Sequence, residues 1–327
     1  MTTALSVRGI IKRFGNHLAV DAISFDVPRG VVYGILGPNG AGKSTTLRMI
    51  NDIIAPDAGE IRILETLTPG AAAATKIGYL PEERGLYPKM KVGEIVEFMG
   101  ELRGLSRAEA RRRGGSWLER LGLGKWTKNK VQDLSKGMQQ KVQFATALLH
   151  EPELVILDEP WSGLDPINAE VLREVVGEFR AAGRTVLFST HQMEQAEKIV
   201  DALCIIARGK IVLEGRLRQL KEDAAAEGWV ALAFGDDASK ERAAGPLGDR
   251  ALVAEQRAPH AGEAAGGAEV EVRLADGATS QQLLAALVAA NVALDRFSLV
   301  VPTLHQMFVD KVGPEAAVAA RHEEDAA

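Results

Sequence analysis

Residues 37–45 read Gly37, Pro38, Asn39, Gly40, Ala41, Gly42, Lys43, Ser44 and Thr45, and they carry the clearest structural signal in the chain. It fits the pattern G-x-x-x-x-G-K-S, follows the apolar run 31–37, and opens a predicted helix that ends before Pro56. Glycines in such a loop let backbone N–H groups point toward phosphate oxygens, and the helix N-terminus adds partial positive charge. We therefore predict that these residues hold a nucleotide, with Lys43 on its β- and γ-phosphates and Ser44 on Mg²⁺. The alternative is a glycine-rich turn with a surface lysine, which the flanking strand and helix disfavour.

The run 153–158, ELVILD, has the apolar character of a buried parallel strand and ends in Asp158. Ligands of open α/β sheets bind beyond the carboxyl ends of the strands, so we expect Asp158 to hold Mg²⁺ directly or through water. Glu159 follows at once, and we predict that it orients and activates an attacking water. The alternative is a strand that ends in a solvated acidic turn, and the phosphate loop upstream favours the hydrolytic interpretation.

Predicted strands and helices alternate through residue 214, which indicates an α/β fold with a parallel sheet. Short β-branched runs lie at 4–10, 19–27, 31–37 and 59–64. Residues 90–150 read mainly as helix, with turn signals at 104–106 and 122–124. After Asp158 the pattern predicts a helix at 166–181, a strand at 184–189, a short helix after His191, and strands within 202–214.

Composition changes near residue 224, and residues 225–313 are predicted to form a small α+β domain. A loop is expected at 256–268, and the Ala- and Glu-rich tail 314–327 is expected to be loose. The other predicted elements are strands at 229–234, 251–255, 270–275 and 293–300 and helices at 279–290 and 302–312.

Bulk composition excludes several classes of protein. The 327 residues suffice for two domains, and the net charge of -5 argues against nucleic acid as a partner. The single Cys204 excludes an internal disulfide, and the N-terminus lacks the long apolar segment of a secretory signal. The longest apolar run, 283–294, is too short to span a bilayer and contains Asn291, so any membrane role is expected to come through a partner.

Four further motifs follow the phosphate loop in a fixed order, and together they resemble the ABC ATPase family. They are LSKGMQQK at 134–141, LDEP at 157–160, SGLD at 162–165 and STH at 189–191. The resemblance covers about residues 4–220. It implies a nucleotide-binding domain at 1–222 with a mainly parallel sheet core, an N-terminal antiparallel β-subdomain and a helical subdomain at about 90–150.

The resemblance also implies roles for single residues, with ATP and Mg²⁺ as cofactors. Ser135 and Gly137 lie in the signature loop, which in this family contacts the γ-phosphate held by a second protomer. His191 corresponds to a histidine that senses this phosphate, and Phe14 to an aromatic residue that stacks on adenine. The alternatives are an ordinary capped helix at Ser135, core packing for Phe14 and a structural histidine at 191. With one phosphate loop and one signature per chain, two copies are expected to pair, as a homodimer.

The chain departs from the family pattern at three positions. The signature has Lys136 for a glycine and Met138 for a glutamine, and Glu82 replaces a glutamine that touches Mg²⁺. Because glutamate offers a similar oxygen, we expect Glu82 to keep that metal contact. The run LPEERGLYPKMKV at 80–92 and the small C-terminal domain resemble ATPases of sodium-efflux and drug-resistance exporters.

This branch implies an ATP-hydrolysing subunit that powers an exporter from the cytoplasmic face of the membrane, through separate transmembrane subunits. The alternative is a non-transport ABC ATPase with a regulatory or nucleic-acid-linked role. The arginine cluster in the helical subdomain has two interpretations, a solvated helix face or a surface for lipid headgroups. Its members are Arg103, Arg107, Arg111, Arg112 and Arg113.

Overall fold

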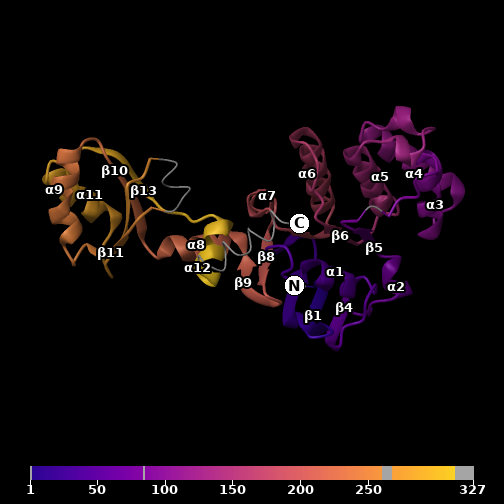
Figure 1. The fold of residues 1–327 in the computed structure, drawn as a ribbon, viewed down its shortest axis with the longest axis horizontal. Helices are drawn as coiled ribbons and strands as arrows, with labels where there is room; N and C mark the ends of the chain where they lie inside the picture. The colour runs from indigo at the N-terminus through magenta and orange to yellow at the C-terminus, as the bar shows by residue number, and fades with distance from the viewer. Residues whose placement is uncertain (1, 84, 260–266, 314–327) are drawn as a thin grey trace. The chain divides into compact units, whose positions relative to one another are not determined.

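The computed structural model describes residues 2–83, 85–259 and 267–313, and the chain divides into two compact units. The first runs to Gly215 and also takes in the last described residues from Lys311, and the second is Arg216–Asp310 (Figure 1). The tail predicted at 314–327 and part of the loop predicted at 256–268 lie outside the described residues.

The first unit is built on a six-stranded sheet with the order β5-β6-β7-β3-β8-β9. All four strand pairs among β5, β6, β7, β3 and β8 are parallel, which confirms the predicted α/β fold. The strands are β3 (Val32–Leu36), β5 (Ile77–Leu80), β6 (Leu154–Asp158), β7 (Thr185–Thr190), β8 (Ala202–Ala207) and β9 (Lys210–Arg216). Every residue of β3, β6 and β7 is buried, as a strand covered on both faces requires.

Three helices accompany this sheet: α1 (Lys43–Ile50), α6 (Pro166–Ala181) and α7 (Met193–Glu197). The start of α6 follows from its sequence, because Asp165 accepts a hydrogen bond from the Asn168 amide at 3.0 Å and Pro166 occupies the first turn. Helix α1 starts at Lys43 and ends at Ile50, before Pro56, as predicted.

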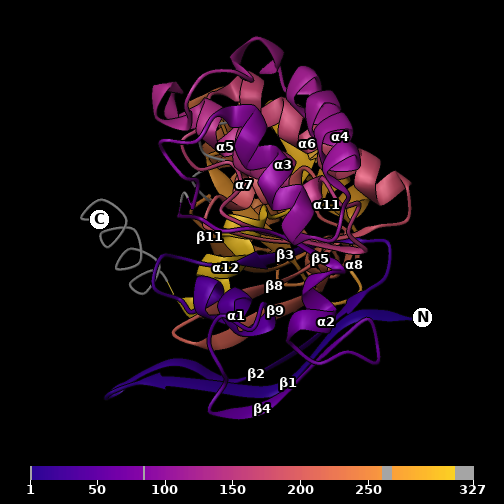
Figure 2. The same cartoon turned by 90° about the vertical axis from the view of Figure 1, so that its right-hand side faces the viewer.

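A second, antiparallel sheet has the order β2-β1-β4 and forms the predicted N-terminal β-subdomain. Its strands are β1 (Thr3–Phe14), β2 (His17–Pro28) and β4 (Ala58–Ile63), and the short helix α2 (Ala71–Ala74) follows. Figure 2 shows β1, β2 and β4 as a layer of their own beside α1. Val7 and Phe25 of this sheet share one hydrophobic core with Ile35 and Ile156 of the parallel sheet.

Residues 92–148 form the predicted helical subdomain, which has a separate hydrophobic core built around Ile95, Leu118 and Val142. Its elements are α3 (Val92–Leu102), α4 (Arg107–Arg120), η1 (Gly124–Trp126), η2 (Val131–Asp133) and α5 (Lys136–Leu148). Figure 1 shows α3, α4 and α5 grouped together. The helices break at both predicted turns, and Ser106 caps α4 by accepting a bond from the Glu109 amide at 3.3 Å.

The second unit is an α+β fold, as predicted, with a four-stranded sheet in the order β11-β12-β10-β13. Its strands are β10 (Trp229–Phe234), β11 (Val253–Arg257), β12 (Val270–Leu274) and β13 (Leu294–Leu299). Its helices are α8 (Leu217–Ala226), α9 (Asp237–Gly248), α11 (Ser280–Ala289) and α12 (Leu304–Val312). Among the described residues, no helix combines the length and the apolar character needed to cross a bilayer.

Helices α8 and α9 were not predicted from the sequence. Helix α8 has no buried residue, and it spans the predicted domain boundary at 222–225. Helix α9 contains Pro246 and two glycines, which normally argue against a helix. It forms because Asp236 caps its first turn, with the Ser239 amide at 2.5 Å, and because Ala243 and Leu247 are buried.

Candidate nucleotide site

The phosphate loop joins the end of β3 to α1, and its glycines are required by close backbone contacts. A Cβ on Gly37 would lie 2.1 Å from the Ile206 carbonyl oxygen, and one on Gly42 would lie 2.5 Å from that of Ala19. Both glycines also have positive φ, 148° and 107°. Gly42 is the N-cap of α1 and supplies no side-chain bond, so the first amides of the helix are left for an anion.

Lys43 lies folded back over this loop and is only 5% exposed. Its Nζ donates to the carbonyl oxygens of Gly37 at 2.8 Å and Pro38 at 3.0 Å, and lies 3.5 Å from Glu159 Oε1. The ammonium group is thus held between the loop that would carry the phosphates and the carboxylate that would activate water.

Asp158 ends β6 and lies next to the start of α1. Its Oδ1 accepts hydrogen bonds from Ser44 Oγ, at 3.1 Å, and from Ser189 Oγ on the neighbouring strand β7. Burial raises the pKa of Asp158 and the charge of Glu159 adds to the rise, while the two serine bonds and Lys43 oppose it; the net shift is upward.

This donor set suits Mg²⁺. The ion favours oxygen ligands and usually takes only one or two carboxylates, with water and phosphate oxygens completing its shell. Ser44 and Asp158 supply a hydroxyl and a carboxylate that already touch. Glu82 is more exposed than Asp158, and the burial of part of its side chain raises its pKa. The charges of Asp158 and Glu159 add to this rise, which indicates that Glu82 lies near both acids. In the described part of the chain, no three His, Cys, Asp or Glu side chains gather as a metal site.

Glu159 is 5% exposed and is the most heavily bonded acid of the site. Its Oε1 accepts from the His191 amide at 3.0 Å and lies 3.1 Å from His191 Nδ1, and its Oε2 accepts from Thr190 Oγ1 at 2.9 Å. Burial raises the pKa of Glu159, but the His191 bond and the charge of Lys43 outweigh it and leave the pKa below its usual value. The carboxylate is therefore ionised at neutral pH and can accept a proton.

The backbone at Glu159 is strained. Its φ is 47°, in the left-handed region that a residue with a side chain occupies at a cost of about 1–3 kcal/mol. The Glu159 amide donates to the Ser189 carbonyl at 3.1 Å, and the Ser162 amide donates to the Glu159 carbonyl at the same distance. These bonds hold a tight turn that directs the carboxylate toward Lys43 and His191.

Phe14 and Ser135 stand apart from this cluster. Phe14 is 50% exposed at the end of β1, with Lys12 Nζ 5.7 Å from its ring centroid, so the core-packing alternative is wrong. Ser135 is exposed and caps α5 as predicted, accepting from the Met138 amide at 3.3 Å. Gly137 is half-buried, and within the described residues neither Ser135 nor Gly137 makes a hydrogen bond to the phosphate loop.

Four polar side chains for which the sequence predicted no role also lie at the site. Ser189 and Thr190 bond to Asp158 and Glu159, and Gln140 and Gln143 of α5 bond to the backbone beside Glu159 and Glu82. The motif STH contains the first two, but their partners depend on the register of β6 against β7, in which Asp158 lies opposite Ser189.

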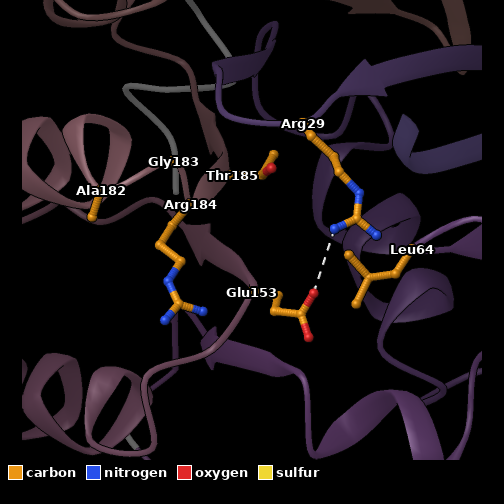
Figure 3. A pocket seen from close by; sticks show the side chains of 7 residues that line it. All are labelled: Arg29, Leu64, Glu153, Ala182, Gly183, Arg184 and Thr185. Atoms are coloured by element: carbon orange, nitrogen blue, oxygen red, sulfur yellow. Dashed lines mark hydrogen bonds and ion pairs between the residues drawn. The ribbon is translucent and has the colours of Figure 1, made fainter. Parts of the chain in front are cut away.

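The cavity drawn in Figure 3 lies away from this cluster. It has a volume of about 360 Å³ and is lined by Arg29, Leu64, Glu153, Ala182, Gly183, Arg184 and Thr185. Glu153 precedes β6 and Thr185 begins β7, so the cavity lies at the amino ends of these strands, whereas Asp158 lies at the carboxyl end. The guanidinium of Arg29 faces the carboxylate of Glu153 at 3.5 Å (Figure 3).

The arginine cluster of the helical subdomain is engaged in ion pairs at the surface. Arg107 and Arg111 pair with Glu97, and Arg112 and Arg113 pair with Glu109. This pairing favours the interpretation as a solvated helix face. The fifth member, Arg103, donates to the carbonyl of Ala74 in α2 at 2.6 Å.

Two family models match the chain. Residues 20–162 match the ABC transporter family, and residues 247–312 match the C-terminal domain of DrrA1-3-like ATP-binding proteins. The first match contains the phosphate loop, the signature and Glu159, and the second lies in the second unit except for its last two residues.

The chain is also similar to curated proteins. An uncharacterized ABC transporter ATP-binding protein of Bacillus subtilis is 40% identical over 309 residues, which is 94% of this chain and 98% of that protein. The Nod factor export ATP-binding protein I of Ralstonia nicotianae is 38% identical, with 67% of this chain and 69% of that protein covered. The linearmycin resistance ATP-binding protein of Bacillus subtilis is 38% identical, with 64% and 68% covered.

Solved structures give the same result. The structure of an ATP binding subunit of an ABC transporter matches with a TM-score of 0.63 and 32% identity, over 68% of this chain and 93% of that one. A dimeric ATP-binding cassette in a post-hydrolysis state, bound to ADP and Pi, matches with a TM-score of 0.61 and 26% identity, over 65% and 99%.

Proposed function

Because this chain belongs to the ABC transporter ATP-binding proteins and hydrolyses ATP, we propose that it powers a membrane exporter through ATP-driven head-to-tail pairing of two copies. The observation that carries the hydrolytic part of the proposal is the contact between Lys43 Nζ and Glu159 Oε1 at 3.5 Å. A phosphate-binding cation and a buried, ionised carboxylate are thereby held next to each other at the end of the phosphate loop, where both can reach a γ-phosphate and its attacking water.

Each residue of the cluster then has a role in converting ATP and water to ADP and phosphate. The loop amides and Lys43 bind the β- and γ-phosphates, and Phe14 stacks on adenine. Glu159 accepts the proton that water loses as its oxygen attacks the γ-phosphorus, and His191 holds Glu159 in place. Ser44, Asp158 and Glu82 would hold Mg²⁺, which when bound neutralises charge on the phosphate oxygens.

The exposed position of Ser135 supports head-to-tail pairing. A serine that caps an exposed helix start presents its hydroxyl and the first amides of α5 to solvent, and these groups suit a phosphate oxygen. In a symmetric pair, the signature of each copy would complete the nucleotide site of the other. The dimeric cassette with ADP and Pi is a precedent for such pairing in a similar protein.

The exporter role rests on the relatives. Two of them are named for Nod factor export and for linearmycin resistance, and the second unit resembles a DrrA-like C-terminal domain. We infer a peripheral position at the cytoplasmic face of the membrane, bound to separate transmembrane permease subunits. Tyr87, in the loop before the helical subdomain, and Phe98 and Leu102 within it are exposed apolar residues of the kind found at protein interfaces, and they support such a partner.

Mixing two inactive variants tests the pairing. Lys43→Ala disables the phosphate loop of one chain, and Ser135→Arg obstructs the nucleotide of the facing chain. In a mixed dimer one composite site carries both defects and the other carries none. Each variant alone should be inactive, and an equal mixture should recover about one quarter of the wild-type ATPase activity if single sites turn over independently.

Two results would contradict this proposal. If Ser135→Arg keeps full activity alone, the signature does not act across the interface. If both variants are inactive and verified mixed dimers recover no activity, either the composite site is misassigned or hydrolysis requires two intact sites in the same dimer. A crosslink from position 135 to the facing phosphate loop separates these two cases.

A further inference from the structure

Helix α5 carries two buried glutamines on one face. Gln140 and Gln143 are three residues apart, so they project from neighbouring positions on the helix surface, and they are 9% and 6% exposed. A buried amide is stable only where its donors find acceptors. The acceptors in this case are backbone carbonyls of the two acidic segments of the nucleotide site.

The Nε2 of Gln140 donates to the Pro160 carbonyl at 2.7 Å. Pro160 directly follows Glu159, whose φ of 47° must be maintained by its surroundings. The Ser189 carbonyl fixes the amide side of Glu159 at 3.1 Å, and Gln140 fixes the chain one residue later. The strained turn is therefore held from both ends.

The Nε2 of Gln143 donates to the Glu83 carbonyl at 3.1 Å and approaches the Pro81 carbonyl at 3.4 Å. These carbonyls lie on either side of Glu82, in a segment that is neither helix nor strand. Since Glu82 is largely exposed, the position of its carboxylate depends chiefly on where Gln143 holds the backbone.

We propose that Gln140 and Gln143 are positioning residues that tie α5 to both acidic segments of this chain's own site. Gln140 sets Glu159 for water activation, and Gln143 sets Glu82 for the metal. The inference rests on the proposed function, which assigns those two roles. Its consequence is mechanical: α5 begins beside Ser135, so contact of Ser135 with the partner's nucleotide is transmitted through one rigid helix to the chain's own carboxylates.

The test compares Gln140→Met and Gln143→Met, which keep the side-chain length and lose the donors. Gln256→Met is the matched control, because Gln256 Nε2 also donates to a carbonyl, that of Leu247 at 2.8 Å in the second unit. Two quantities are measured on the full chain. One is the Mg²⁺ concentration at half-saturation for binding of a fluorescent ATP analogue, in the Glu159→Gln background. The other is kcat and KM for ATP at saturating Mg²⁺.

Gln143→Met should raise the Mg²⁺ requirement for binding about 10-fold, as loss of a group that orients a metal ligand does, with kcat nearly kept at saturating Mg²⁺. Gln140→Met should lower kcat about 10-fold, with KM and the Mg²⁺ requirement unchanged. Gln256→Met should match the wild type in both. Should a methionine variant fail to fold, asparagine at the same position keeps an amide of shorter reach and should give the same shift, reduced in size.

The inference is overturned if Gln140→Met and Gln143→Met change the Mg²⁺ requirement and kcat in the same way. Either both behave like the wild type, or both lose binding and turnover together with a lowered melting temperature. Glu82→Ala separates this failure from that of the proposed function. If Glu82→Ala raises the Mg²⁺ requirement and Gln143→Met does not, the positioning role is wrong and the metal role stands. If neither raises it, the metal role of Glu82 is wrong, and the role of Gln143 falls with it.

Discussion

Replacement of Glu159 by glutamine separates ATP binding from hydrolysis most sharply. A glutamine fits the same space and keeps one oxygen to accept from the His191 amide, which bonds to Glu159 at 3.0 Å. Its NH₂ group would face Thr190 Oγ1, a hydroxyl that can accept as well as donate. Lys43 loses its carboxylate neighbour but keeps the carbonyls of Gly37 at 2.8 Å and Pro38 at 3.0 Å. The phosphate loop should therefore keep its shape.

Glu159→Gln should lose the part of the hydrolysis rate that a general base contributes. Positioned proton acceptors contribute about 10²- to 10⁴-fold to rate, which corresponds to an increase of about 3–5 kcal/mol in the barrier. The variant should bind ATP at least as tightly as the wild type, because the phosphates replace the negative charge removed from beside Lys43. With ATP bound and hydrolysis blocked, the paired state should accumulate.

Three measurements check this prediction: equilibrium binding of ATP, single-turnover release of phosphate, and size-exclusion chromatography with and without ATP. Glu178→Gln is the control, since this glutamate pairs with Arg120 on the surface and has a 60% exposed side chain. A Glu159→Gln protein whose turnover stays within about threefold of wild type would exclude Glu159 as the base. Loss of ATP binding in that variant would refute the argument that the phosphate loop is independent of the carboxylate.

Other substitutions test the remaining residues. Lys43→Ala should weaken ATP binding about 10-fold or more and abolish turnover, because a charged donor to phosphate is worth about 1.5–3 kcal/mol; titration calorimetry measures this. Phe14→Ala should weaken ATP binding about 10-fold with little change in melting temperature, since base stacking is worth about 1–3 kcal/mol and the ring is 50% exposed. Glu82→Gln should be tolerated, whereas Glu82→Ala should raise the Mg²⁺ concentration needed for ATP binding. Glu83→Ala is the control, because the Glu83 side chain is 88% exposed, and it should leave the Mg²⁺ requirement unchanged. Burial lowers the pKa of His150 to about 4 in the folded state, whereas its ordinary value in the unfolded chain is 6.5. Between these two pH values the ring is therefore neutral in the folded protein and protonated in the unfolded chain. Stability should therefore fall as pH drops from 6.5 toward 4, by at most about 3 kcal/mol for a partly buried ring, and urea unfolding at pH 7 and pH 5 should show that His150→Gln removes this loss.

The elements that could be predicted from sequence are those whose signal is local. The phosphate loop carries a local signal, because Gly37 and Gly42 both have positive φ, a backbone conformation that favours glycine. The apolar run that ends in Asp158 predicts a buried strand without knowledge of its neighbours, and β6 is buried throughout. These two signals together predict which residues share the carboxyl edge of the sheet.

What could not be predicted depends on register and on backbone strain. Ser189 reaches Asp158 across 31 residues of sequence, and only the alignment of β6 with β7 makes them partners. The helical period places Gln140 and Gln143 on one face, but no pattern indicates which carbonyls they reach. The left-handed φ of Glu159 could not be predicted from the sequence either, since glutamate has no preference for that conformation.

The three acids of the site, Glu82, Asp158 and Glu159, differ in the direction in which their surroundings shift their pKa values. Burial raises the pKa of Asp158 and of Glu82, and the charges of neighbouring carboxylates add to the rise. A divalent cation would stabilise the ionised form of both carboxylates, in agreement with the proposal that Asp158 and Glu82 hold Mg²⁺. Glu159 is buried more deeply than Glu82, yet its pKa is lowered because His191 donates to it and Lys43 faces it. An ionised, strongly held carboxylate beside the phosphate-binding lysine suits proton acceptance better than metal binding. The different roles of adjacent Asp158 and Glu159 therefore come from their neighbours: Asp158 faces the hydroxyls of Ser44 and Ser189, and Glu159 faces Lys43 and His191.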